Sequence, residues 1–270
     1  MNDYFSDRVV VITGAASGIG RALASELGRR GARVWLADID VEGGRQAAAE
    51  CGGKFVPCDV ASAEQVAELA RQVVADAGGL DIAFVNAGVC RGGPVDELTR
   101  EDWQQSIDIN VWGAVHALWA FLPPMLARGC GRLVFTTSMA GLTGLPYVAP
   151  YCASKFALVG LAQSLSVELA GRGVGVTCVC PGAVRTRVME GEGLRLPGDW
   201  LPRIRSWLER RGADPQRVAR RILRGVRRGR PLVIVAAGGL RPAWWLRRAA
   251  PRLSDHLGRA ALRAALRRHS

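Results

Sequence analysis

Short apolar strands alternate with helical segments along most of this chain, and this alternation constrains the fold more than any other feature. Strands are predicted at residues 8–13, 33–37, 54–58, 81–85, 132–137, 175–179 and 232–235. They are apolar along their whole length, as in parallel sheets that are covered on both faces. Helical patterns occupy residues 21–30, 41–51, 63–77, 100–128, 151–172 and 214–228. The sequence therefore predicts an α/β fold with a doubly wound parallel sheet of about seven strands.

We expect one domain over residues 1–240 and a basic helical extension over residues 241–270, because no linker or internal repeat divides the sequence. The 270 residues, 49% of them hydrophobic, supply a large core, which excludes a disordered chain or a fibre. The apolar stretch Pro231–Leu240 is far shorter than the ~20 residues that a membrane-spanning helix needs. Residues 1–8 contain two aspartates and no apolar run, so we expect no signal peptide.

The seven cysteines are scattered and show no metal-binding spacing. None belongs to a Cys-x-x-Cys pair, and Cys178 and Cys180 lie on one face of a single predicted strand. We expect buried, reduced thiols, as in cytoplasmic proteins, and no metal site.

The positive charge lies at the C-terminal end of the chain. From Arg203 onward there are nineteen arginines, no lysine and three acidic residues, a net charge of +16. Because the whole chain carries +12, the first 202 residues carry −4. A segment this basic is expected to attract an anionic partner, which could be acidic lipid, nucleic acid, an acidic protein or an anionic substrate.

A glycine-rich turn joins the first predicted strand to the first predicted helix, with the sequence Thr13-Gly14-Ala15-Ala16-Ser17-Gly18-Ile19-Gly20. Glycines at such a turn let the backbone approach a pyrophosphate, and the free N–H groups of the following helix attract its charge. Together with the predicted sheet, the turn indicates a Rossmann-like fold that binds a dinucleotide.

Asp38 ends the second predicted strand, 18 residues beyond Gly20. A carboxylate at this place accepts hydrogen bonds from both hydroxyls of an adenosine ribose and repels a 2′-phosphate. No arginine or lysine lies within the glycine turn, and Ile39 follows the aspartate. We therefore predict NAD rather than NADP as the cofactor.

Tyr151 and Lys155 are four residues apart at the start of a predicted helix, so their side chains lie on one helical face. A phenol with a pKa of about 10 is a poor base at neutral pH, but a neighbouring ammonium stabilises the phenolate and lowers that pKa. Such a tyrosine can exchange a proton with an alcohol oxygen. Lys155 is one of only two lysines in an arginine-rich chain, which indicates a specific need for a compact ammonium.

In order and spacing, these motifs resemble the main NAD(P)-dependent class of the short-chain dehydrogenase/reductase (SDR) family, over about residues 7–240. The motifs that carry the resemblance are Thr13-Gly-x-x-x-Gly-x-Gly20, Asp59-Val60, Asn86-Ala87-Gly88, Asn110, Ser138, Tyr151-x-x-x-Lys155, Pro181-Gly182 and Thr186. The family often has a second asparagine before Asn86, where this chain has Val85, which is a mild departure.

The resemblance implies four catalytic residues. Tyr151 would be the acid/base, Lys155 would lower its pKa and hold the nicotinamide ribose, and Ser138 would hydrogen-bond the substrate oxygen. Asn110 would lie in the long helix over residues 100–128 and help to hold a water for proton relay.

The resemblance also implies a set of cofactor contacts. Asp59 and Val60 would flank the adenine, and Asn86 and Gly88, with Ala87 between them, would line the cofactor and brace the sheet. Pro181, Gly182, Val184 and Thr186 would border the nicotinamide, with Thr186 on its carboxamide. The predicted set is completed by Tyr151, Lys155, Asp38 and Ile39 and, from the glycine turn, by Thr13, Gly14, Ser17, Gly18, Ile19 and Gly20.

The segment between Arg185 and Asp214 is expected to be a loop that covers the substrate. Its apolar residues are Val188, Met189, Leu194, Leu196, Trp200, Leu201, Ile204, Trp207 and Leu208, and Met139, Leu142, Leu145 and Val148 are expected on the opposite wall. These side chains either pack on one another or enclose a bulky hydrophobic secondary alcohol or ketone, such as a steroid, a terpenoid, an aromatic carbinol or a fatty chain. The arginines of this segment either are solvated or bind an anionic group.

The tail from Pro242 to Arg268 repeats apolar residues at helical spacing between arginines, and Trp244 and Trp245 resemble an interfacial anchor. Three interpretations stay open. The tail lies peripherally on an anionic membrane, or it packs across a subunit or over the substrate entrance, or it is a loosely ordered basic segment. Nucleic acid is a less favoured partner, because no recognition motif accompanies the charge.

We therefore predict an enzyme, an NAD-dependent oxidoreductase that transfers a hydride between a secondary alcohol and its ketone. The alternatives are a non-catalytic NAD-sensing protein and a membrane- or polyanion-binding scaffold that keeps the fold. The resemblance further implies a homodimer or homotetramer that assembles through the helices near residues 100–128 and 151–172, and the cysteine usage predicts a cytoplasmic protein.

Overall fold

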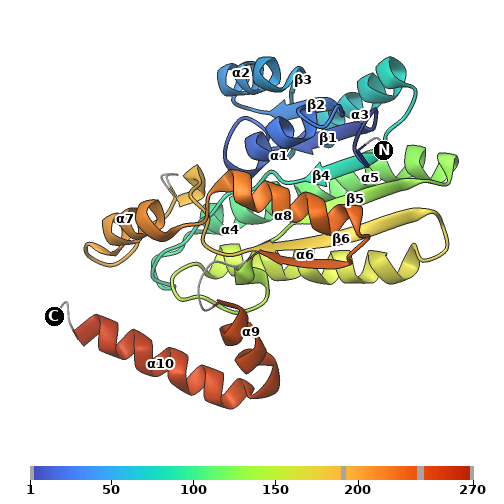
Figure 1. Cartoon of the computed structure of the whole chain (residues 1–270). Helices are drawn as coiled ribbons and strands as arrows, with labels where there is room; N and C mark the ends of the chain where they lie inside the picture. The colour runs from blue at the N-terminus through green and yellow to red at the C-terminus, as the bar shows by residue number, and fades with distance from the viewer. Residues whose placement is uncertain (1–2, 190–192, 236–239, 268–270) are drawn as a thin grey trace.

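The computed structural model describes residues 3–189, 193–235 and 240–267, and at its centre lies one parallel sheet of seven strands (Figure 1). The strands are β1 (Val9–Thr13), β2 (Arg33–Asp38), β3 (Lys54–Pro57), β4 (Ile82–Val85), β5 (Gly131–Thr136), β6 (Val174–Pro181) and β7 (Leu232–Val235). Their spatial order is β3-β2-β1-β4-β5-β6-β7. The predicted doubly wound parallel sheet is confirmed, with strand ends shifted by at most two residues.

Helices cover both faces of the sheet, and each face has its own apolar core. One face carries α1 (Gly18–Gly28), α2 (Val41–Cys51) and α8 (Pro215–Arg227), and the other carries α3 (Ala63–Ala77), α5 (Gly113–Arg128) and α6 (Ala149–Glu168). Phe84 is fully buried on the first side and Phe121 on the second. Each such side chain contributes about 1.5–3 kcal/mol by leaving water.

The order of the strands reverses between β1 and β4. From β1 the chain continues to β2 and β3 on one side, whereas β4 and the later strands follow on the other. At such a point the loops that leave the carboxyl ends of the two strands diverge and open a crevice for a ligand. The glycine turn follows β1, and the segment from Asn86 to Gly88 follows β4, so the fold brings both to this crevice.

The helix predicted over residues 100–128 is interrupted. The chain forms α4 (Arg100–Ile107), a π-helical turn η1 (Asp108–Trp112) and then α5. The prediction of one regular helix was wrong because the helix widens into a single π-helical turn at Asp108–Trp112, an irregularity that often occurs at functional sites. The span Arg100–Arg128 is long and apolar enough to cross a membrane, but Phe121 and Met125 are fully buried against the sheet, as in a core helix.

The segment between Arg185 and Asp214 is not only a loop, because it contains the helix α7 (Trp200–Arg211). Trp200, Ile204, Trp207 and Leu208 recur at helical spacing and share one face, which lines a cavity. The expectation of a loop was therefore wrong for residues 200–211. The helical spacing of these apolar residues is visible in the sequence and could have predicted the helix.

The C-terminal tail forms two helices, α9 (Leu240–Ala249) and α10 (Pro251–Arg267), which extend below the sheet in Figure 1. The single helical rhythm predicted from Pro242 is broken after Ala249, because a proline disfavours helical geometry in the residue before it and begins the next helix well. The tail contacts the rest of the molecule, since Trp244 packs against the core. Arg268 lies outside the described residues.

All seven cysteines are free thiols, and five of them are buried as expected. Cys51 is half-buried, and Cys130 is exposed in the turn between α5 and β5, so the expectation of buried thiols was wrong for these two. The side chains of Cys178 and Cys180 lie 3.8 Å apart on one face of β6. Within the described residues, no three histidine, cysteine or acidic side chains are grouped closely enough to hold a metal ion.

Candidate active site

A cavity of about 770 Å³ opens at the carboxyl ends of the strands, and most of the predicted site residues line it. These are Gly14, Ser17, Gly18, Ile19, Asp38, Ile39, Asp59, Val60, Asn86, Ala87, Gly88, Ser138, Tyr151, Lys155, Pro181, Gly182, Val184 and Thr186. Thr13, Gly20 and Asn110 do not line it. Residues from Gly14 to Leu208 thus meet at one place.

The glycine turn has the geometry that a phosphate group requires. Gly14 and Gly18 have φ angles of +64° and +54°, in the left-handed region that favours glycine. Ser17 occupies the N-cap of α1 without using its side chain there, and the first turn of α1 holds no acidic residue. The positive end of the helix is therefore uncompensated where it meets the cavity, which fits a negatively charged pyrophosphate.

Thr13, Asn86 and Gly20 hold this turn in place from behind. The Thr13 hydroxyl accepts hydrogen bonds from the N–H groups of Asn86 and Ala87, at 3.0 and 3.1 Å. The Asn86 amide donates to the carbonyls of Thr13 and Gly14, at 3.0 and 3.1 Å. A Cβ at Gly20 would lie only 2.0 Å from the Gly14 carbonyl oxygen. Thr13 and Gly20 therefore shape the site without lining it.

Asp38 is the last residue of β2, and its carboxylate is fixed at the edge of the cavity. One oxygen accepts a hydrogen bond from the N–H of Ala16, at 2.9 Å, and the other from the N–H of Asp40, at 3.0 Å. Each carboxylate oxygen can accept more than one hydrogen bond. The carboxylate can therefore also accept hydrogen bonds from two neighbouring ribose hydroxyls.

Tyr151 and Lys155 lie one turn apart on α6 and face the same cavity. The Lys155 Nζ atom lies 5.6 Å from the centroid of the Tyr151 ring and donates to the Thr136 carbonyl, at 3.3 Å. Ser138 follows β5, and its side chain forms a hydrogen bond with that of Tyr151. The Ser138 hydroxyl also accepts a hydrogen bond from the N–H of Ala140, at 3.1 Å, which fixes its direction.

Burial shifts the pKa of both groups. It raises the pKa of the Tyr151 phenol above its ordinary value, and the hydrogen bond with Ser138 opposes this shift. It also lowers the pKa of the Lys155 ammonium to about 8. The predicted lowering of the Tyr151 pKa is thus not found in the protein without a ligand. The cost of removing the phenolate from water outweighs its stabilisation by the nearby ammonium.

Asn110 lies in the π-helical turn and is only 1% exposed. Its amide nitrogen donates to the Val89 carbonyl and to the Ser154 hydroxyl, at 3.0 and 2.8 Å, and its amide oxygen accepts from the N–H of Val89, at 2.8 Å. Ser154 in turn donates to the carbonyl of Tyr151, at 2.8 Å. This network ties the segment after β4 to the helix that carries Tyr151, while the relay of a proton through a water near Asn110 stays a prediction.

Two hydroxyls next to Ser138 have different surroundings. Thr137 donates to the Val179 carbonyl, at 2.7 Å, and so points into the sheet. The Thr136 hydroxyl is buried on the cavity wall and has no hydrogen-bond partner among the described residues. Buried polar atoms usually have a hydrogen-bond partner, so this hydroxyl fits a site where a polar ligand supplies the missing partner. The sequence had no signal for Thr136, Ser154 or Val89, because their roles depend on contacts between distant segments.

The outer part of the cavity is apolar. Trp200, Ile204, Trp207 and Leu208 of α7 face Leu145 and Val148 across it. Val188, Met189, Leu196 and Met139 also line it as predicted, whereas Leu194, Leu201 and Leu142 pack into the core instead.

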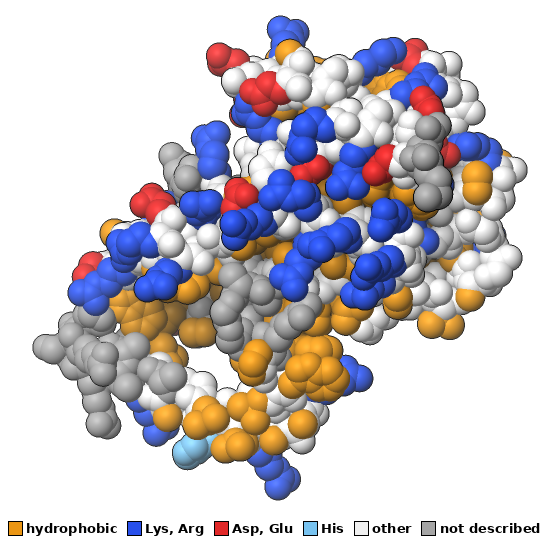
Figure 2. Space-filling view, in the orientation of Figure 1, with side chains coloured by type: hydrophobic (Ala, Val, Ile, Leu, Met, Phe, Trp, Pro, Cys, Tyr) orange, Lys and Arg blue, Asp and Glu red, His pale blue; other side chains and the backbone are white. Residues whose placement is uncertain are grey.

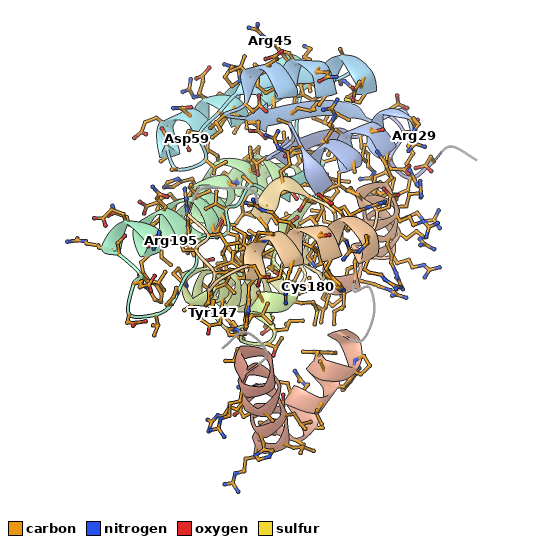
Figure 3. The ribbon with its side chains drawn as sticks, turned by 90° about the vertical axis from the view of Figure 1, so that its left-hand side faces the viewer. Arg29, Arg45, Asp59, Tyr147, Cys180 and Arg195 are labelled. Carbon is orange, nitrogen blue, oxygen red and sulfur yellow. The ribbon has the colours of Figure 1, made fainter. Side chains whose placement is uncertain are left out.

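Tyr147 is a further wall residue that the sequence analysis missed. Its φ angle is +63°, and its ring stacks edge-on against Trp200, with the centroids 5.5 Å apart. In Figure 3 Tyr147 lies in the lower part of the body, above the tail helices, and Asp59, which lines the same cavity, lies well above it.

Two arginines of this region are engaged within the protein and are not available to a ligand. Arg195 forms an ion pair with Asp102, at 2.5 Å. Arg205 donates two hydrogen bonds to the Met189 carbonyl, at 2.9 and 3.1 Å. Arg195 holds the segment before α7 against α4, and Arg205 ties α7 to the short helical turn Arg187–Met189.

Comparison with known proteins gives a consistent result. The family model described as short chain dehydrogenase matches residues 8–194. D-threitol dehydrogenase of Mycolicibacterium smegmatis is 39% identical over 67% of this chain and 72% of that protein. The 2,5-dichloro-2,5-cyclohexadiene-1,4-diol dehydrogenase of Sphingobium indicum is 39% identical over 68% of this chain and 76% of that protein. A short chain dehydrogenase/reductase from Burkholderia phymatum, solved in complex with NAD, is similar in structure, with a TM-score of 0.84, 29% identity and coverage of 93% and 96%.

Proposed function

This chain belongs to the short-chain dehydrogenase family, and we propose that it uses NAD to interconvert a bulky hydrophobic secondary alcohol and its ketone, with Tyr151 as the acid/base. The observation that carries the proposal is that Tyr151, Lys155 and Ser138 face the same cavity as the glycine turn. A protein that only sensed or bound NAD would not need this set of side chains. The enzyme is therefore favoured over the non-catalytic alternatives.

The proposed mechanism assigns one task to each side chain. The Tyr151 hydroxyl takes the proton from the alcohol, or returns it to the ketone, while the Ser138 hydroxyl holds the same oxygen by a hydrogen bond. The Lys155 ammonium, 5.6 Å from the phenol ring, stabilises the phenolate and holds the ribose. NAD, when bound, would supply the acceptor or the donor of the hydride. Because Tyr151 and Lys155 belong to one rigid helix, their relative positions are fixed before the substrate arrives.

The apolar walls support a hydrophobic substrate. The cavity holds the cofactor at its glycine-rich end, and the space that remains lies between α7 and the segment that contains Leu145 and Val148. Walls of this kind bind apolar rings or chains, and the few polar groups orient the reacting oxygen. The names of two relatives, a D-threitol dehydrogenase and a cyclohexadienediol dehydrogenase, both specify an alcohol and support a CH–OH group as the reacting centre.

A panel of secondary alcohols tests this function directly. With NAD present, NADH absorbance should rise for cyclic, aromatic or long-chain secondary alcohols and remain low for the smallest ones, because only large apolar groups fill the outer cavity. NAD binding should be measured in parallel. A protein that binds NAD but turns over no member of the panel in either direction would support the sensing alternative instead.

We expect Asp38→Ala to weaken NAD binding by about ten- to a hundredfold, because hydrogen bonds to a charged group contribute about 1.5–3 kcal/mol. NADP binding should stay the same or improve, since the repulsion of its 2′-phosphate is removed. Titration of both nucleotides by tryptophan fluorescence measures the preference. Asp40→Ala is the matched control, because its carboxylate caps α2 and does not line the cavity. An unchanged NAD/NADP ratio in Asp38→Ala would contradict the proposed specificity.

We also propose a homodimer or homotetramer that works in the cytoplasm. Exposed tryptophans on α4 and in η1 and α5, namely Trp103, Trp112 and Trp119, support assembly through these helices, as do the exposed Phe156 and Val167 of α6. Large apolar side chains that are exposed together in this way commonly mark a protein–protein interface. The seven free thiols support a reducing compartment.

A further inference from the structure

A second cavity, of about 470 Å³, lies beside the edge strand β7 and shares no residue with the active-site cavity. It is bounded by α8 on one side and by α9 on the other. Four arginines line it, together with two tryptophans and three apolar residues of β7: Arg221, Arg224, Arg228, Arg230, Trp244, Trp245, Leu232, Val233 and Ile234. The cavity therefore combines positive charge with aromatic and apolar surface.

The positive charge follows from the two faces of α8. Val218, Ile222 and Leu223 are buried, and the opposite face presents arginines at spacings of three and four residues. Arg220 pairs with Glu26, at 3.2 Å. For the four arginines of the cavity, no acidic partner is found in the part of the chain that the structure describes. Within the described ranges, the charge of the cavity is thus not neutralised by an acidic side chain.

The two tryptophans form the other wall. Their ring centroids lie 4.8 Å apart, and the Arg248 guanidinium lies 6.0 Å from the centroid of the Trp244 ring. Trp244 packs against the core, whereas Trp245 is 60% exposed. One indole therefore anchors the tail to the body, and the other is left at the surface beside arginines, as in proteins that lie at a membrane interface.

The tail helices continue this surface. Leu253 and Leu257 of α10 are 50% and 49% exposed, and Arg252 and Arg259 lie exposed near them in the sequence. Asp255 is the only acidic residue of residues 240–267 and pairs with Arg247. Figure 2 shows a row of basic side chains across the face that carries α8 and hydrophobic side chains along the tail below it. The arginines and the exposed apolar groups thus lie on neighbouring parts of the molecule.

We propose that this cavity and the tail together bind the surface of a membrane that contains anionic phospholipid. The arginines of α8 take the headgroup phosphate, and Trp245, Leu253 and Leu257 enter the interface between headgroups and acyl chains. A nucleic acid would match the charge but would not cover the exposed leucines. A second copy of the chain, docked symmetrically by the same face, would bring two uncompensated sets of arginines together. The proposal goes beyond the enzyme activity and does not depend on it.

The test is cosedimentation of the full-length protein with vesicles of phosphatidylcholine, alone or mixed with phosphatidylglycerol. The wild type should bind only the mixed vesicles, and less at high salt. The cavity variant Arg221→Gln/Arg224→Gln/Arg228→Gln should bind roughly a hundredfold more weakly, at about fivefold for each basic residue near the surface. Arg45→Gln/Arg100→Gln/Arg172→Gln removes the same charge from exposed positions elsewhere and should bind as the wild type does. Trp245→Gln/Leu253→Gln/Leu257→Gln should also lose binding.

Several results would overturn the proposal. They are equal binding to neutral and anionic vesicles, no binding to either, or an equal loss of binding in the cavity variant and its control. Glycerol phosphate, added at constant ionic strength, separates a lipid site from a site for a soluble anion. Displacement of the protein from the vesicles would show that the cavity takes the free phosphate, and retention supports the lipid surface. If the cavity variant does not fold, the wild-type comparison of the two vesicle types still decides.

Discussion

Tyr151→Phe should lower kcat by roughly 10²- to 10⁴-fold, the contribution typical of a positioned acid or base, and leave NAD affinity nearly unchanged. The substitution removes only the hydroxyl that exchanges the proton, and the ring keeps its place on α6 beside Lys155. The pH profile should change as well. Burial raises the pKa of this phenol, and the base is the phenolate, so alcohol oxidation by the wild type should increase with pH and ketone reduction should decrease. In the variant this dependence should be lost.

Steady-state kinetics in both directions, with nucleotide titration, measure these effects. Tyr147→Phe is the matched control, because it removes the other tyrosine hydroxyl of the same cavity and leaves the acid/base intact. Its kcat should stay close to that of the wild type. Turnover by Tyr151→Phe at the level of this control would show that the proton is exchanged elsewhere.

Asn110→Ala should lower the free energy of unfolding by about 2–6 kcal/mol, because both the N–H and the carbonyl of Val89 lose their side-chain partner and each unsatisfied group costs about 1–3 kcal/mol. Asn110 is almost fully buried, so water does not replace these bonds easily. The segment after β4 should also shift relative to α6, so kcat should fall together with the free energy of unfolding. Urea unfolding measures the first effect and steady-state kinetics the second.

Ser154→Ala separates the parts of this network. It removes the hydrogen bond from Asn110 to Ser154 and the one from Ser154 to the Tyr151 carbonyl, but it keeps both bonds between Asn110 and Val89. We expect a smaller loss, of about 1 kcal/mol. Equal stability of Asn110→Ala and the wild type would mean that the network does not support the site.

Much of the fold could be predicted because its signals are local. An apolar run of a few residues followed by a turn defines a buried strand wherever it occurs, and the same rule located all seven strands. The glycine turn could be predicted for a similar reason, since Gly14 and Gly18 take left-handed φ angles that other residues avoid. The helical spacing of Tyr151 and Lys155 placed both side chains on one face before any contact was known.

Other features depend on which residues meet in space. The π-helical turn at Asn110 was not predicted, and only the contacts of Asn110 with Val89 and Ser154 show what the turn positions. The pKa of Tyr151 depends on how much water the folded chain removes from it, and burial reversed the shift that the spacing with Lys155 predicted. The arginine cavity beside β7 requires residues of α8 and α9, which are separated by a strand in the sequence, to border the same space.

The sequence by itself thus determined the parallel sheet, the nucleotide turn and the pair of side chains on α6, because strand and helix periods and glycine conformations are properties of neighbouring residues. Only the tertiary structure decided which polar atoms are satisfied, how deeply the tyrosine is buried and that arginines of α8 and tryptophans of α9 line one cavity. These are properties of burial and of contacts between residues far apart in the chain, and no local pattern records them.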